Sequence, residues 1–189
     1  MIDRVQAGAM VLAPLLLLAG TLSSLPGDKF SESVSHGVLQ LFAFGMFFLA
    51  FAGLAKQIAP TLPRAAVALL VTGVLGAQSG VAWGMVVIAR DKGLELHAGD
   101  LAMAFDIGAL FPLTLIGFGV CILRTRIAPA WAGAGLALAG IAFPISRIGT
   151  IGELALVADV LMLVSLVGVA VALVGRAPVP VPAAKPALT

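Results

Sequence analysis

Residues 152–175 read GELALVADVLMLVSLVGVAVALVG, an almost unbroken apolar run. A membrane-spanning helix needs about 20 mostly apolar residues, because each residue adds about 1.5 Å along the helix axis. Two acids interrupt the run, Glu153 at its start and Asp159 well inside it. The stretch therefore predicts a membrane-spanning helix that carries a carboxyl group within the membrane.

The composition of the whole chain extends this prediction. Of its 189 residues, 61% are hydrophobic and 11% are charged, whereas soluble domains carry about 25% charged residues. Five further apolar stretches lie at 5–25, 36–57, 64–89, 99–123 and 129–146, and short polar connections separate them. We therefore predict an all-α integral membrane bundle of six transmembrane helices in one domain, residues 1–176, followed by a Pro-rich disordered tail, residues 177–189.

The first apolar stretch could instead be a secretory signal peptide, because Arg4 precedes its apolar core. That core is long for a signal peptide and Pro14 interrupts it. No small-residue cleavage motif precedes the polar connection that follows. We therefore expect residues 5–25 to be retained as the first helix of the bundle.

The charged residues of the connections predict the orientation of the bundle. With six spans the two termini share a side, and seven of the 11 basic residues fall on it: Arg4, Lys56, Arg64, Arg124, Arg126, Arg176 and Lys185. Cytoplasmic loops are enriched in Lys and Arg, so both termini are expected in the cytoplasm and the chain in the plasma (cell inner) membrane as a multi-pass protein. Eight of the nine acids fall at or below the outer surface.

Several kinds of function find no support in the sequence. The single cysteine, Cys121, excludes an internal disulfide and a cysteine-based metal cluster. The formal net charge of +2 is too small to suggest nucleic-acid binding. The motifs H-E-x-x-H, C-x-x-C, G-x-S-x-G and the P-loop do not occur. The partners expected from composition are the lipid bilayer and a lipophilic small molecule.

Two carboxyl groups carry the main functional hypothesis. Asp106 and Asp159 each lie about seven residues, or roughly 10 Å, below the outer end of a predicted helix. An ionised carboxyl group at that depth costs about 2.5–3.5 kcal/mol, so it normally faces the protein interior or a wet cavity. Each could be protonated or could bond a neighbouring hydroxyl such as Thr150 or Ser165. Alternatively, both line one outward-opening pocket, with Arg147 as a counter-ion.

Histidines and carboxamides add further candidates. His36 opens the second stretch and Gln40 follows one helical turn later. His36 and His97 are either interfacial polar residues or a general base, metal ligands or axial haem ligands. Gln78, in the third stretch, is either a hydrogen-bonding contact between helices or a residue of the pocket.

Acids near helix starts and small residues along the third stretch have structural interpretations. Asp100 and Glu153 each lie one residue inside a predicted helix start, where an acid interacts favourably with the helix dipole. Gly76, Gly80 and Gly84 recur every fourth residue, a spacing that lets another backbone approach closely. This face could join the chain to a second copy in a homo-oligomer. Trp83 is expected to be an interfacial anchor or a packing residue rather than a ligand contact.

A resemblance to a known family involves some of these residues. His36-Gly37 opens the second helix, the third helix is Gly-rich and contains Trp83, and Gly99-Asp100 opens a fourth helix with Pro112 downstream. In these features residues 30–123 resemble the membrane-bound styrene oxide isomerases, small helical proteins that rearrange an epoxide to an aldehyde. The resemblance implies haem b as Lewis acid and His36 as its axial ligand, with Gln40 where that family has an asparagine. The chain has neither the tyrosine nor the asparagine of that family's site.

Three functions are compatible with these residues. The first is an isomerase that rearranges a lipophilic epoxide with haem b, in which Asp106 or Asp159 stabilises the developing cation. The second is non-enzymatic, a small membrane subunit or a lipophile-binding or transport protein. The third is a metal-free cyclase or isomerase in which one of the paired carboxyl groups is protonated and the other is ionised.

Overall fold

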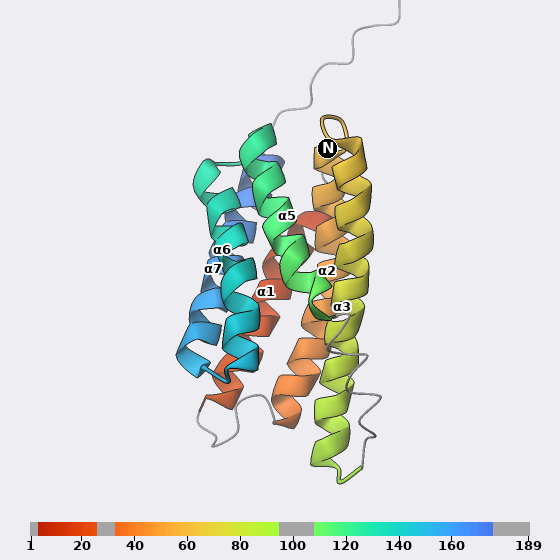
Figure 1. Ribbon diagram of the computed structural model, residues 1–189, viewed down its shortest axis with the longest axis vertical. Helices are drawn as coiled ribbons and strands as arrows, with labels where there is room; N and C mark the ends of the chain where they lie inside the picture. Colours follow the sequence, from red (N-terminus) through yellow and green to blue (C-terminus); the bar gives the residue numbers. More distant parts are fainter. Residues whose placement is uncertain (1–3, 26–32, 95–107, 176–189) are drawn as a thin grey trace, which may run out of the picture.

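The computed structural model describes residues 4–25, 33–94 and 108–175, and every regular element within them is a helix (Figure 1). The helices are α1 (Arg4–Ser24), α2 (Val34–Ile58), α3 (Pro63–Asp91), α5 (Leu110–Thr125), α6 (Ala130–Ile148) and α7 (Gly152–Val174). Five of them are long and apolar enough to cross a membrane. The sixth, α5, has 16 residues, a length of about 24 Å at 1.5 Å per residue.

The helices follow the apolar stretches of the sequence closely. The expected stretches 5–25, 36–57, 64–89, 129–146 and 152–175 correspond to α1, α2, α3, α6 and α7 within a few residues. Of the fourth stretch, 99–123, the structure describes the part that forms α5, from Leu110 onward. Residues 95–107, which include His97, Asp100 and Asp106, lie outside the described residues, as does the predicted tail.

The six helices form a closed ring in which each contacts two neighbours. The order around the ring is α1, α2, α3, α5, α6 and α7, after which α7 contacts α1 again, and α2 also touches α5 across the centre. Successive helices run in opposite directions (Figure 1). One end of the bundle, which we call the basic end, carries Arg4, Lys56, Arg64, Arg124 and Arg126. The opposite end holds the close of α1, the start of α2 and the turn between α6 and α7.

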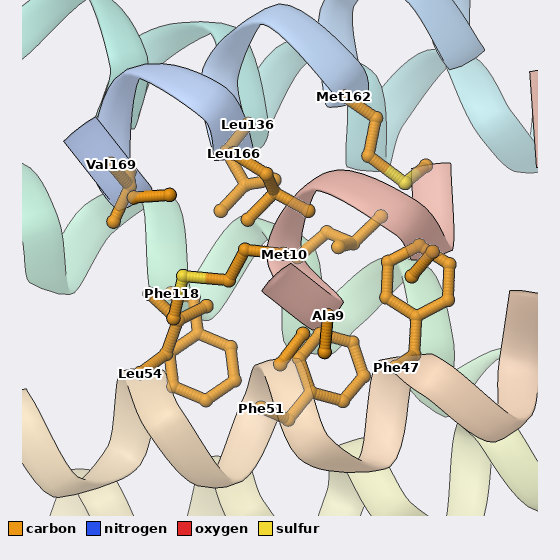
Figure 2. Close-up of a cluster of buried hydrophobic side chains, with 14 of the residues drawn as sticks. Ala9, Met10, Phe47, Phe51, Leu54, Phe118, Leu136, Met162, Leu166 and Val169 are labelled. Carbon is orange, nitrogen blue, oxygen red and sulfur yellow. The ribbon is translucent and has the colours of Figure 1, made fainter. Parts of the chain in front are cut away.

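Aromatic rings fill the centre of the ring of helices. Phe44, Phe47 and Phe51 of α2 contact Phe111 of α5, with ring centroids 4.7–5.8 Å apart. Such pairs contribute about 0.5–1.5 kcal/mol each beyond the area they bury. Figure 2 shows Met10 of α1 between this layer and the aliphatic side chains of α6 and α7. The apolar core therefore links α1, α2, α5, α6 and α7.

Glycines allow α2 and α3 to approach at backbone distance. A Cβ on Gly84 would lie 2.8 Å from the Gly37 carbonyl oxygen, and a Cβ on Gly37 would lie 2.9 Å from that of Gly84. Gly80 faces the Phe44 ring, and Gly76 faces the backbone of Phe111. The predicted glycine ladder therefore packs on α2 and α5 of the same chain, and association with a second copy stays a prediction.

We expect Gly84→Ala to destabilise the protein by about 1–3 kcal/mol, because the added methyl group meets backbone that cannot rotate away. Gly45→Ala is the matched control, since a Cβ at that position would have nothing within 4 Å and alanine is the better helix former. Thermal unfolding of both variants in one detergent, followed by circular dichroism, measures the difference. Equal melting temperatures for the two variants would contradict the close α2–α3 contact.

Candidate functional site

Buried polar side chains gather in the half of the bundle away from the basic end. Thr21 and Ser24 lie in the last turn of α1, His36 and Gln40 at the start of α2, and Ser146 and Asp159 beside the turn between α6 and α7. We call the set of Thr21, His36, Gln40, Arg147 and Asp159 the polar cluster. Its members come from α1, α2, α6 and α7, so the closed ring brings them together.

An ion pair forms the centre of the polar cluster. Nη2 of Arg147 donates hydrogen bonds to both carboxylate oxygens of Asp159, at 3.2 Å to Oδ1 and 3.0 Å to Oδ2. The Asp159 side chain is 0% exposed, whereas that of Arg147 is 18% exposed. The sequence-based prediction that Arg147 serves as the counter-ion of Asp159 is confirmed. A buried acid and a partly accessible base therefore face each other within the bundle.

The turn between α6 and α7 brings the two residues of this ion pair together. Arg147 lies in the last turn of α6, where the helix carbonyl groups favour a cation. The connection folds α7 back along α6 through Thr150, whose φ is 51°. Residues twelve positions apart therefore meet across the turn. The Phe143 ring, 5.2 Å from the guanidinium carbon, supports the Arg147 side chain from its own helix.

The hydroxyl group of Thr21 completes the network from the other end of the chain. Its Oγ1 accepts a hydrogen bond from Nη2 of Arg147 at 3.0 Å and donates one to Oδ2 of Asp159 at 2.5 Å. The hydroxyls named from the sequence do not take this role: Thr150 donates to the Gly149 carbonyl, and the Ser165 side chain lies against Gly135. The network thus joins α1 to α6 and α7, where the ring of helices closes.

His36 and Gln40 stand beside this network at the start of α2. The Ser33 hydroxyl caps the helix by accepting a hydrogen bond from the His36 amide. His36 is 1% exposed and Gln40 is 8% exposed. The imidazole packs against Gly20 of α1, interacts with the Gln40 side chain and lies within electrostatic range of Arg147. The side chains of both residues are therefore buried within the bundle, near the N-terminal end of α2.

The haem at His36 that the resemblance implies stays a prediction. An axial ligand needs one ring nitrogen that faces the macrocycle. A Cβ on Gly20 would lie 3.4 Å from Nδ1 of His36, and the residue as a whole is enclosed. Within the described ranges, no group of three or more His, Cys, Asp or Glu side chains could hold a metal ion.

The remaining predicted residues lie apart from the polar cluster. Gln78 is exposed on α3, on a different face from the buried glycine ladder. Trp83 lies 5.8 Å from the Arg90 guanidinium carbon, in keeping with a packing or anchoring role. Glu153 is exposed in the first turn of α7, as predicted. His97, Asp100 and Asp106 lie outside the described residues, so the pocket between Asp106 and Asp159 stays a prediction.

Thr21 is the member of the site that sequence reasoning did not identify. A hydroxyl group inside an apolar stretch is a weak signal, because such a group can bond a carbonyl of its own helix. Thr72 and Thr114 do so here, through the carbonyls of Ala68 and Leu110. Only the packing of α1 on α7 shows that Thr21 instead bonds charged groups.

Comparison with protein-family models, with curated proteins and with solved structures gives no match for this chain. The resemblance of residues 30–123 to styrene oxide isomerases therefore stays a prediction. The functional conclusion rests on the geometry of the polar cluster.

We expect Asp159→Asn and Arg147→Gln each to cost about 3–5 kcal/mol in unfolding free energy, because each leaves one buried charge without its partner. The double variant should recover much of that loss, since both charges are then removed. The control is Glu153→Gln, because Glu153 is an exposed acid on the same helix as Asp159. This variant should change stability by less than about 0.5 kcal/mol. Additive losses in the double variant would show that the pair is not coupled.

We expect Thr21→Val to cost about 1–3 kcal/mol, because it removes a hydroxyl that bonds two charged groups and leaves the shape of the side chain unchanged. Thr21→Ser should retain most of the stability. Thermal unfolding compares the two variants, and equal losses would contradict the role of the hydroxyl group.

Proposed function

We propose that this chain is a non-enzymatic membrane protein that binds an amphipathic lipophile, with the polar cluster as the recognition site for its polar end. The observation that carries this proposal is the commitment of Asp159. Its carboxylate accepts hydrogen bonds from Arg147 and Thr21 and is completely buried. General acid or base catalysis needs a carboxyl group that can exchange its proton with a substrate. A carboxylate that is buried and already bonded to Arg147 and Thr21 is suited instead to holding these two side chains in position.

The charges of the cluster favour a neutral polar group on the ligand. Arg147 and Asp159 compensate each other, so a second ion would enter without a counter-charge. The guanidinium of Arg147 is the more accessible partner, at 18% exposure against 0% for Asp159. His36 and Gln40 add hydrogen-bonding groups beside it. A hydroxyl or carbonyl oxygen on a long apolar chain matches these donors.

The proposal includes the position of the site in the membrane. The basic end carries five of the described basic residues, which favours its placement in the cytoplasm. The chain is then a six-span protein of the plasma membrane with both termini cytoplasmic, and its fourth helix begins near residue 99. In this orientation the polar cluster lies in the outer half of the bilayer. A lipophile dissolved in that leaflet would be bound from the membrane itself.

A pair of photoreactive probes tests this function. A long-chain alcohol that carries a diazirine should label peptides of α1, α6 or α7 in membranes, and the matching long-chain amine should label them less. Labelling should fall in His36→Ala and Gln40→Leu. Thr114→Val is the control, because it removes a buried hydroxyl that bonds Thr72 and Leu110 outside the polar cluster. Equal labelling in all these variants would overturn the binding proposal.

The haem-dependent isomerase and the binding proposal make opposite predictions for the absorbance spectrum of the purified protein. The binding proposal predicts no Soret absorbance after haemin is added to the protein in detergent. A Soret band that disappears in His36→Ala would replace the binding proposal with the isomerase. Turnover of an epoxide that Asp106→Asn and Asp159→Asn both abolish, without a Soret band, would favour the metal-free enzyme.

A further inference from the structure

An apolar groove runs along the outside of α6 and α7 toward the basic end. It has a volume of about 510 Å³ and is lined by Pro129, Trp131, Leu163, Val164, Val167, Gly168, Val171 and Ala172. Trp131 is 55% exposed and its indole lies directly over Gly168, the position where a side chain would displace it. The groove is separate from the polar cluster, which lies at the opposite end of the same two helices.

The length of the groove matches one leaflet of a bilayer. Its lining on α7 extends from Leu163 to Ala172, a distance of about 14 Å at 1.5 Å per residue. The hydrocarbon core of a membrane is about 30 Å thick, so each leaflet contributes about 15 Å. Five helices of the chain are long and apolar enough to cross that core. The groove therefore faces acyl chains over the depth of a single leaflet.

Positively charged residues lie close in the sequence to the groove residue Pro129 at the basic end. Arg124 lies in the last turn of α5 and Arg126 follows at its C-cap, three residues before Pro129 of the groove. Both arginines are exposed. No side chain caps the first turn of α6, which begins beside Trp131, so its amide groups add to the positive potential. No acid is found among the described residues of this connection between α5 and α6.

We propose that the groove binds one acyl chain of an anionic phospholipid whose headgroup phosphate contacts Arg124 and Arg126. The apolar lining of the groove matches an acyl chain, and its length matches the depth of one leaflet. The two arginines match the negative charge of the headgroup. Trp131 lines the groove from the first turn of α6, and indole rings concentrate at the interfaces of membrane proteins. Each arginine near a membrane surface strengthens the binding of an anionic lipid by roughly fivefold, so the pair gives a clear preference over a zwitterionic lipid.

Fluorescence of Trp131 tests the proposal directly. In Trp83→Phe protein, Trp131 is the remaining tryptophan. The protein is reconstituted in phosphatidylcholine vesicles that contain a small fraction of either brominated phosphatidylglycerol or brominated phosphatidylcholine. We expect brominated phosphatidylglycerol to quench Trp131 at a mole fraction lower by roughly fivefold or more. In the Arg124→Gln/Arg126→Gln variant the two lipids should become equivalent.

Two controls keep the result specific. Arg64→Gln removes one exposed arginine at the same basic end, on α3, and should preserve the preference. Trp131→Phe protein leaves Trp83 as reporter, away from the groove, and should show equal quenching by both lipids. Equal quenching of Trp131 by the two lipids would overturn the proposal. So would shielding of Trp131 from both, which would indicate that a partner helix covers the groove.

Discussion

A buried carboxylate has to find its hydrogen-bond donors inside the protein, because the surrounding hydrocarbon offers none. Asp159 is such a group, with a completely buried side chain on α7. Its donors come from α6, through Arg147, and from α1, through Thr21. The requirement therefore fixes how three helices stand relative to one another. It also closes the ring, since α1 and α7 are the first and last helices of the described chain.

Two kinds of interior follow from this arrangement. Phenylalanine rings of α2 and α5 fill the centre of the bundle, where dispersion and shape complementarity hold the helices. Hydroxyl, imidazole, amide and charged groups occupy the half away from the basic end. Backbone contact at Gly37 and Gly84 brings α2 and α3 together without large side chains between them. The polar half is thus packed against an apolar half, an arrangement compatible with the proposed binding site.

The same packing changes how the candidate residues should be understood. His36 and Gln40, which the sequence placed at a helix start near the surface, are enclosed between α1 and α2. The haem chemistry suggested by the resemblance to styrene oxide isomerases stays a prediction. Asp159 forms an ion pair with Arg147. The proposed recognition of a lipophile requires only that these groups remain fixed and hydrogen-bonded.

The sequence by itself determined the class of the protein and the bounds of most helices, and it offered the pairing of Asp159 with Arg147 as one of two alternatives. Apolar stretches of about 20 residues specify membrane helices through length alone, and the ion pair spans a short turn that places residues twelve positions apart side by side. Only the tertiary structure decided that Thr21 joins the pair, that the glycines of α3 pack on α2 and α5, and that Gln78 faces outward. These outcomes depend on which helices become neighbours in the ring. Hydrophobic periodicity marks the face that a helix buries but not the helix that covers it.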